Sequence, residues 1–144
     1  MPNEVLQKVG TQQVFNVTAG FGPTAENDLR TAAAQTNNAI TLANVATNAA
    51  RQSAKADLGA TRARGYSVMA TFEWGTAPTS GNVVNLYWAP SPHATAGNAN
   101  PGGCSGADAA YDGGANLTLA EGLKQLDFIG SFVCGAVDTI QSAV

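Results

Sequence analysis

The sequence predicts a mainly β chain, an antiparallel β-sandwich or jelly roll with long loops and little helix. Three observations lead to this fold class. Apolar side chains alternate with others from Tyr66 to Trp74, which is the period of a half-buried strand. A second predicted strand, Asn82–Ala89, is apolar on both faces. Stretches rich in Gly, Pro, Ala and Asn separate the apolar segments, as turns and loops do.

The N-terminal segments give weaker signals. We expect a first strand over Gln12–Val17, and a second over Ile40–Ala43 after a polar break at Thr36–Asn38. Thr24–Gln35 fits either a short helix or irregular chain. A rival interpretation is an Ala-rich helical hairpin over Thr24–Ala60, because Ala is the best helix former. Asn and Thr, which favour caps and turns, would lie on every face of it, so we favour short strands and loops.

Four of the seven Lys and Arg residues lie between positions 51 and 64. In a strand, Arg62 and Arg64 would share one face. This face is either a solvated edge, where charge blocks unwanted pairing, or a docking surface for an acidic partner. The candidate partner-contact residues come from this segment and from the long loop that follows the second strand. They are Arg51, Lys55, Arg62, Arg64, His93, Asn98 and Asn100.

The two strongest strands, Tyr66–Trp74 and Asn82–Ala89, are expected to pair as a hairpin around Gly75–Gly81, a loop longer than the commonest hairpin connections. The second strand carries two sets of side chains, Val84, Leu86 and Trp88 on one face and Val83, Asn85 and Tyr87 on the other. Because the latter face is only partly polar, we expect a second sheet or a neighbouring subunit to cover it.

The remaining residues predict one long loop and three further elements. Pro90–Gly114 has no apolar period, and loops of this length are usually functional or disordered. Asn116–Leu126 allows a short helix or turn, weakened by Gly122. Asp127–Cys134 is expected to be a central strand. Ile140–Val144 begins another strand, and we expect the fold to continue past it. Residues 1–144 are interpreted as a single β domain with an extended or irregular region over about 1–50.

Composition narrows the function. Charged residues are 12% of the chain, against an ordinary share of about 25%, and small side chains take their place. Such surfaces are typical of chains that pack side by side in assemblies, and secreted domains can share them. The net charge of −3 and only seven cations argue against nucleic-acid binding, which needs many cations. No apolar run is long enough to cross a membrane. The first ten residues do not form a signal peptide.

The sequence predicts no catalytic residue, no metal, no cofactor and no enzymatic activity. One histidine and two cysteines are too few for a structural zinc site, and Cys104 and Cys134 are expected to be free thiols. Cys104 with His93 could form a nucleophile and its base, but we favour the interpretation that both are ordinary loop residues. Asp108 and Asp112 could offer oxygens to calcium, but their spacing departs from that of a calcium loop.

Several segments together resemble a family of virion structural proteins of tailed bacteriophages. They are Asp57–Thr61, Tyr87–Pro92, Asn100–Gly103, Ser105–Tyr111 and Phe128–Gly130. The resemblance covers roughly Asp57 to the end and leaves the N-terminal third outside it. It implies a β-sandwich or jelly roll that assembles on the phage particle, and similar sequences continue with further strands. The resemblance supplies no catalytic residue.

The function that the resemblance implies is a structural component of a bacteriophage virion. The most concrete expectation is a capsid decoration or cement protein that stabilises the shell. A tail or baseplate structural protein is one alternative, and a jelly-roll module that binds a host-surface glycan is another. The expected partners are the major capsid protein or other virion proteins and further copies of the chain in a homo-oligomer, without nucleic acid or membrane. The expected location is the virion, after synthesis in the host cytoplasm.

Overall fold

The computed structural model describes residues 13–16, 36–59, 65–72, 74, 76–137 and 141–143. Within these ranges the chain is mostly strand with little helix, which confirms the mainly β prediction. The elements, in chain order, are β1 (Gln13–Asn16), β2 (Thr36–Ala39), β3 (Ala50–Gln52), β4 (Ala70–Phe72), β5 (Val83–Trp88), the 3-10 turn η1 (Pro101–Gly103), β6 (Ala109–Tyr111), α1 (Leu119–Leu123), β7 (Asp127–Val133) and β8 (Gln141–Ala143).

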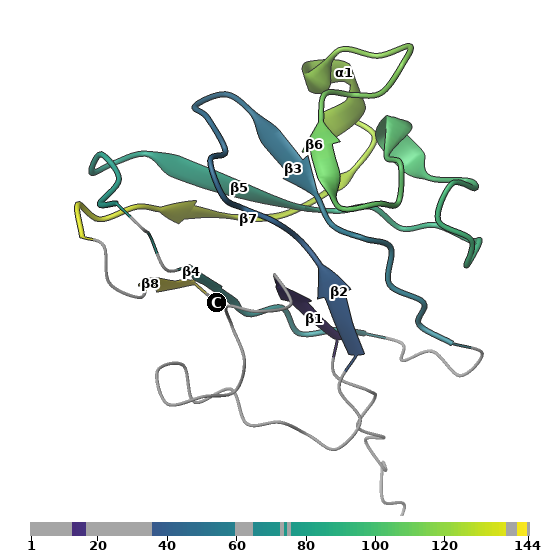
Figure 1. Ribbon diagram of the computed structural model, residues 1–144, viewed down its shortest axis with the longest axis horizontal. Coiled ribbons are helices and arrows are strands. Elements are labelled where there is room, and N and C mark those ends of the chain that lie inside the picture. The colour runs from purple at the N-terminus through teal and green to yellow at the C-terminus, as the bar shows by residue number, and fades with distance from the viewer. Residues whose placement is uncertain are drawn as a thin grey trace, which may run out of the picture.

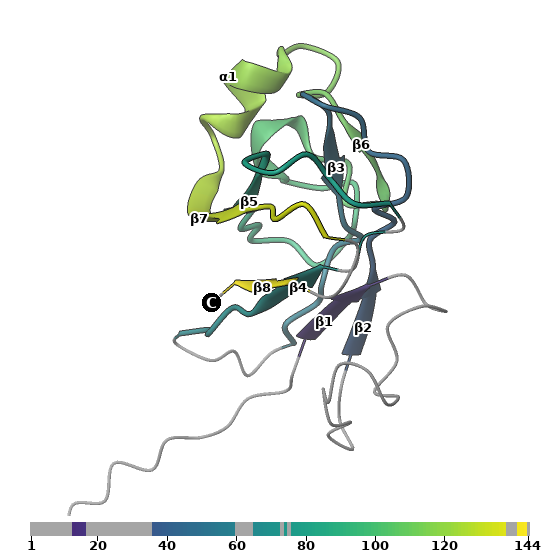
Figure 2. The ribbon, with the colours of Figure 1, turned by 90° about the vertical axis from the view of Figure 1, so that its left-hand side faces the viewer.

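The strands pair two by two. Among the described residues β3 pairs with β6, β4 with β8, and β5 with β7, each antiparallel, whereas β1 and β2 run parallel. The pairs β3–β6 and β5–β7 lie in the half of the molecule that carries α1, and β1–β2 and β4–β8 lie in the other half (Figures 1 and 2). Every ladder except β1–β2 joins segments distant in sequence, so side-chain pairing rather than tight turns sets the topology.

β5 and β7 form the longest ladder, and a bulge changes which of its side chains face outward. The register is regular from Val83 to Leu86, which lies opposite Gly130, but the next pair is Tyr87 with Phe128. Ile129 is therefore an extra residue on β7, and a bulge of this kind reverses the alternation beyond it. The rings of Tyr87 and Phe128 meet edge to face at 5.5 Å, on the face opposite to the one that regular alternation predicts for Phe128.

The predicted hairpin between Tyr66–Trp74 and Asn82–Ala89 is wrong. In the described part of the first segment only β4 is a strand, and it pairs with β8, while β5 pairs with β7. β7 is long enough to pair with all six residues of β5, whereas the three residues of β4 could pair with only half of them.

The two segments of the expected hairpin meet through side chains instead. The ring of Tyr66 stacks on Trp88 with centroids 6.3 Å apart, and Phe72 of β4 packs on Phe132 of β7 at 5.2 Å. Phe72 also stacks on Trp74. Aromatic contacts of this kind add stability beyond their buried area, so the β4 segment contributes to the β5–β7 core without joining its ladder.

The other predicted elements have mixed outcomes. The strand at Gln12–Val17 is confirmed as β1, but the strand predicted over Ile40–Ala43 is wrong, because β2 occupies the polar stretch just before it. Asn38 is 6% exposed there, and its Nδ2 donates to Gln13 Oε1 at 3.1 Å, so the buried amide is satisfied across the strand pair. Residues 36–59 contain no helix. The prediction over Thr24–Gln35 lies outside the described residues.

The C-terminal third follows the sequence more closely. The helix, the strand near Asp127 and the last strand are confirmed as α1, β7 and β8. Within the described residues β7 has one strand partner, β5, rather than the two of a central strand. The segment predicted to be a loop, Pro90–Gly114, contains η1 and β6.

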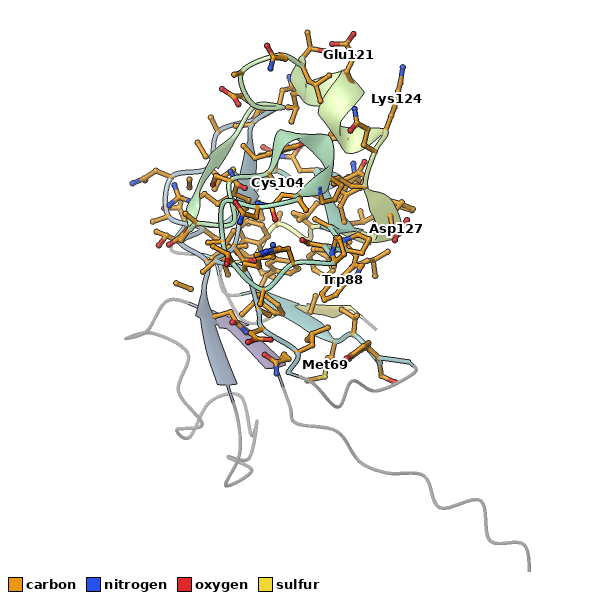
Figure 3. The ribbon with its side chains drawn as sticks, turned by 90° about the vertical axis from the view of Figure 1, so that its right-hand side faces the viewer. Met69, Trp88, Cys104, Glu121, Lys124 and Asp127 are labelled. Carbon is orange, nitrogen blue, oxygen red and sulfur yellow. The ribbon has the colours of Figure 1, made fainter. Side chains whose placement is uncertain are left out.

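α1 and η1 pack closely around a buried tyrosine. The hydroxyl of Tyr111 donates to the Gly102 carbonyl at 2.5 Å, and a Cβ on Gly122 would collide with that hydroxyl. The helix begins in a reciprocal capping box in which Thr118 and Glu121 satisfy each other's backbone N–H. Glu121 and Lys124 project away from the body of the molecule, whereas Cys104 lies within it (Figure 3).

The hydrophobic core is small. Among the described residues the buried hydrophobic side chains are Tyr111, Phe132 and Cys134, at 5%, 7% and 3% exposure, and none is below 2%. Both cysteines are free, as expected. A two-stranded ladder is marginally stable in water unless its apolar face is covered. Much of the largest ladder is exposed, as Val83, Phe128 and Val133 show.

Candidate functional site

The side of the β5–β7 ladder that faces away from Phe132 is apolar and exposed. We define this outer face as Val83, Asn85, Tyr87, Phe128, Ile129, Ser131 and Val133. Val83 is 53% exposed, Phe128 58%, Ile129 41% and Val133 62%. Single exposed apolar residues are ordinary, but a contiguous group of them marks an interaction site.

The outer face carries no charged side chain. Its polar residues satisfy each other, because Ser131 Oγ donates to Asn85 Oδ1 across the ladder at 2.7 Å. The Val83–Val133 pair lies on one side of this bond and the Tyr87–Phe128 pair on the other. A partner can therefore cover the face without desolvating an ion, which is the costly step in burying a surface. The structure confirms that this face is only partly polar.

A second cluster surrounds the ammonium of Lys55, just after β3. Lys55 Nζ donates to Ser91 Oγ at 2.8 Å and Asn100 Oδ1 at 2.7 Å, and it also contacts two backbone carbonyls, Thr95 O at 3.1 Å and Asn98 O at 3.0 Å. Residues 91–100 thus curl around one cation. We call them the Lys55 loop.

A third cluster holds the end of the same long segment. The carboxylate of Asp108 accepts hydrogen bonds from the backbone N and Oγ1 of Thr41 and from Nε and Nη2 of Arg51. The side chains of Arg51 and Asp108 are 25% and 19% exposed. The pKa of Asp108 is lowered, first by the Thr41 hydroxyl and backbone bonds and then by Arg51. This carboxylate is committed to the fold, with its oxygens used by protein donors.

The structure brings four of the seven predicted partner-contact residues together in one group. Lys55, Asn98 and Asn100 meet in the Lys55 loop, and His93 joins them because its backbone N donates to Ser91 Oγ at 3.2 Å. Arg51 stands apart on Asp108. Arg62 and Arg64 lie outside the described residues. Whether any of these side chains touches a partner stays a prediction.

The sequence did not predict the roles of three residues in these clusters. They are Ser91 in the Lys55 loop, and Thr41 and Asp108, whose side chains bond to each other. Ser91 is the hub of the Lys55 loop, where its Oγ also donates to Ala99 O at 3.0 Å. The available signal was Ser91-Pro92-His93, since Ser before Pro favours a turn closed by the hydroxyl. Thr41 and Asp108 are 67 positions apart, and no local pattern in the sequence joins them.

The environment of the Cys104 thiol does not favour its acting as a nucleophile. Burial raises the pKa of the Cys104 thiol, which disfavours the reactive thiolate. Burial also raises the pKa of the neighbouring Tyr111, followed by the charges of Cys104 and Asp112. The ring Nδ1 of His93 accepts a hydrogen bond from the backbone N of Thr95 at 3.1 Å, so this nitrogen serves a local turn.

The described ranges contain neither a cluster of metal-binding side chains nor a helix that could span a membrane. No group of three or more His, Cys, Asp or Glu side chains there could hold a metal ion. None of the helices within the same residues has the length and apolar character required to span a bilayer. Two surfaces of the described chain are candidates for function, the outer face and the Lys55 loop.

Comparison with known families, proteins and structures finds no protein similar to this chain. The chain matches no family model, no curated protein and no solved structure. The resemblance to phage virion proteins is therefore carried by the quoted sequence segments alone.

Proposed function

We propose that the chain is a structural subunit of a tailed-bacteriophage virion, most concretely a capsid decoration or cement protein. Its partners are the major capsid protein or other virion proteins, and further copies of itself on the particle. The proposal includes a β-sandwich or jelly roll. In it, the two-stranded ladders are extended or covered by other strands or by neighbouring subunits. The observation that carries it is the outer face of β5–β7, uncharged and exposed at Val83, Phe128, Ile129 and Val133.

The free energy available from burying the outer face favours a contact between subunits that are held together in an array. Fully burying a large apolar side chain contributes about 1.5–3 kcal/mol, so covering the exposed halves of these four contributes on the order of 3–6 kcal/mol. Association itself costs at least about 4 kcal/mol. The outer face alone therefore supports a weak contact in dilute solution. On a shell, where neighbours are held at high effective concentration, the same contact becomes stable.

The low charge of the chain supports the same function. Charged residues are 12% of the sequence, so copies can pack side by side without burying unpaired ions. The long segment from Ser91 to Asp108 is held to the body by Lys55 and by the Thr41 and Arg51 bonds to Asp108. A rigid loop loses little entropy when a partner binds it, which suits a second contact surface.

The test is to isolate particles that contain the chain, count its copies and remove it. A cement protein is present in high copy number, and particles without it lose resistance to heat. A handful of copies per particle would instead favour a tail or baseplate protein. If the chain is absent from particles and binds a defined glycan on an array, the binding module replaces the virion proposal.

A further inference from the structure

The ammonium of Lys55 lies among four oxygen atoms of its own chain. Two are side-chain oxygens, Ser91 Oγ and Asn100 Oδ1, and two are the carbonyls of Thr95 and Asn98, all within 3.1 Å of Nζ. None belongs to a carboxylate. An ammonium has three donors and no acceptor, so these four acceptors engage its whole hydrogen-bonding capacity.

The shape of the Lys55 loop depends on a positive charge at this point. Without one, the carbonyl oxygens of Thr95 and Asn98 and the amide oxygen of Asn100 would converge with no cation between them, at a place open to solvent. The loop also contains Ala99 at φ 51°, a conformation that non-glycine residues rarely adopt. A strained residue persists only where its surroundings hold it.

The rest of the loop is organised from the same atoms. Asn100 accepts from Lys55 with Oδ1 and donates with Nδ2 to Ala96 O at 2.6 Å and Cys104 O at 2.9 Å. Ser91 Oγ accepts both from Lys55 and from the His93 N–H. Loss of the ammonium would therefore release both ends of the loop at once.

We propose that Lys55 is a positioning residue, whose ammonium is the built-in cation of a neutral oxygen cage formed by residues 91–100. The cage has the chemistry that monovalent cations take, since carbonyl oxygens can replace a hydration shell. Lys55 therefore directs its charge into its own chain, and the surface a partner meets at this place is the loop. The proposal concerns the isolated chain and is independent of its assembly on a particle.

Lys55→Met tests the proposal because it keeps an apolar stem and removes the ammonium. We expect amide hydrogen exchange at Thr95 and Asn98 to accelerate at least tenfold, with exchange in β5 and β7 unchanged. Ammonium chloride should restore the slow exchange, and tetramethylammonium chloride, which has no N–H donor, should not. Lys124→Met, at the exposed C-cap position just after α1, is the matched control and should leave the loop unchanged.

Two results would overturn the proposal. One is slow, wild-type exchange in the loop of Lys55→Met. The other is fast exchange that both salts restore equally or that neither restores. The unmodified chain supplies an independent measurement should the variant fail to fold. Acetylation by acetic anhydride, followed by mass spectrometry, should be at least tenfold slower at Lys55 than at Lys124, and equal rates would contradict the proposal.

Discussion

Arg51 and Asp108 meet through a single oxygen, since Nε and Nη2 of the guanidinium donate to Oδ1 of the carboxylate at 3.1 and 2.9 Å. Thr41 adds its backbone N to the same oxygen and its hydroxyl to the other. This contact joins the segment after β2 to β3 and to the residue before β6. It thereby fixes one end of the long segment that carries the Lys55 loop.

The first prediction concerns acid. Because the folded-state pKa of Asp108 is lowered, its contribution to stability is present above the unfolded pKa and is lost as pH falls through the folded pKa. Asp108→Asn should therefore be less stable at neutral pH and should lose less stability on acidification. Thr41→Val, which removes the hydroxyl donor, should show part of the effect. Denaturant unfolding between pH 7 and pH 2 measures both.

Some acid sensitivity should remain in Asp108→Asn. The pKa of Glu121 is lowered by the backbone N–H and hydroxyl of Thr118, so its contribution is lost over the same acidic range. If Asp108→Asn retains the full neutral-pH stability and the full acid dependence of the wild type, the anchoring role of this carboxylate is wrong.

The second prediction concerns Gly122 in α1. Helix propensity alone favours Ala over Gly by about 1 kcal/mol. In the fold a Cβ at this position would collide with the Tyr111 hydroxyl and come within 2.9 Å of Gly102 O and Gly113 Cα. Gly122→Ala should therefore lose on the order of 1–3 kcal/mol of unfolding free energy. Gly130→Ala is the control, because its Cβ meets nothing within 4 Å.

A double-mutant cycle sharpens this result. Tyr111→Phe alone leaves the Gly102 carbonyl without its donor and should cost about 1–3 kcal/mol. Because it also removes the oxygen that Gly122→Ala strikes, the two costs should add to more than the cost of the double variant. Simple additivity would mean that the collision with Tyr111 is not what makes Gly122 necessary.

The third prediction concerns the start of α1. Thr118→Ala removes the capping hydroxyl and should cost about 1 kcal/mol. Thr118→Ser keeps the hydroxyl and should be close to the wild type. Helices this short do not form alone, so the loss should appear in global denaturation and as faster amide exchange at Glu121. Equal stability of the Ala and Ser variants would exclude the capping box as a significant contribution.

The fourth prediction concerns the outer face in the isolated chain. Val133 is 62% exposed, so Val133→Lys should change the unfolding free energy by no more than about 0.5 kcal/mol. Thermal unfolding of the purified variant measures this. A loss of several kcal/mol would show that Val133 is covered within a single chain and that the outer face is part of its core.

Periodicity predicted the strands better than it predicted their partners. Runs of apolar residues identified β5 and β7, whereas the clearest alternation, over Tyr66–Trp74, yielded only the three-residue strand β4 in the described part of that segment. Nothing in the sequence distinguished a β4–β5 hairpin from a β5–β7 ladder, since register between distant segments is decided by packing. The bulge at Ile129 could not be predicted from the sequence either, and it places Phe128 on the outer face. Thr36–Ala39 looked like a break because it is polar, and the bond that satisfies the Asn38 side chain runs across the strand pair to Gln13.

The contacts of the candidate site residues could not be predicted for the same reason, because they join distant parts of the chain. Cations near positions 51–64 and polar residues in the long loop were recognised as special, but each was assigned to an outside partner. The structure joins Lys55 to Asn98 and Asn100, and Arg51 to Asp108. Such contacts span about 40 to 60 positions of chain, and single-sequence patterns report only on neighbours within one element.

The most direct test of the central claim is the occupancy of Val133→Lys on phage particles, counted by electron cryo-microscopy beside the wild type. Ala120→Lys, at an exposed position on α1, is the matched control for added charge. If the outer face meets a virion neighbour, Val133→Lys should be strongly depleted from particles, because its ammonium would be buried without a partner, whereas Ala120→Lys should bind at the wild-type copy number. Full occupancy by Val133→Lys would contradict the account.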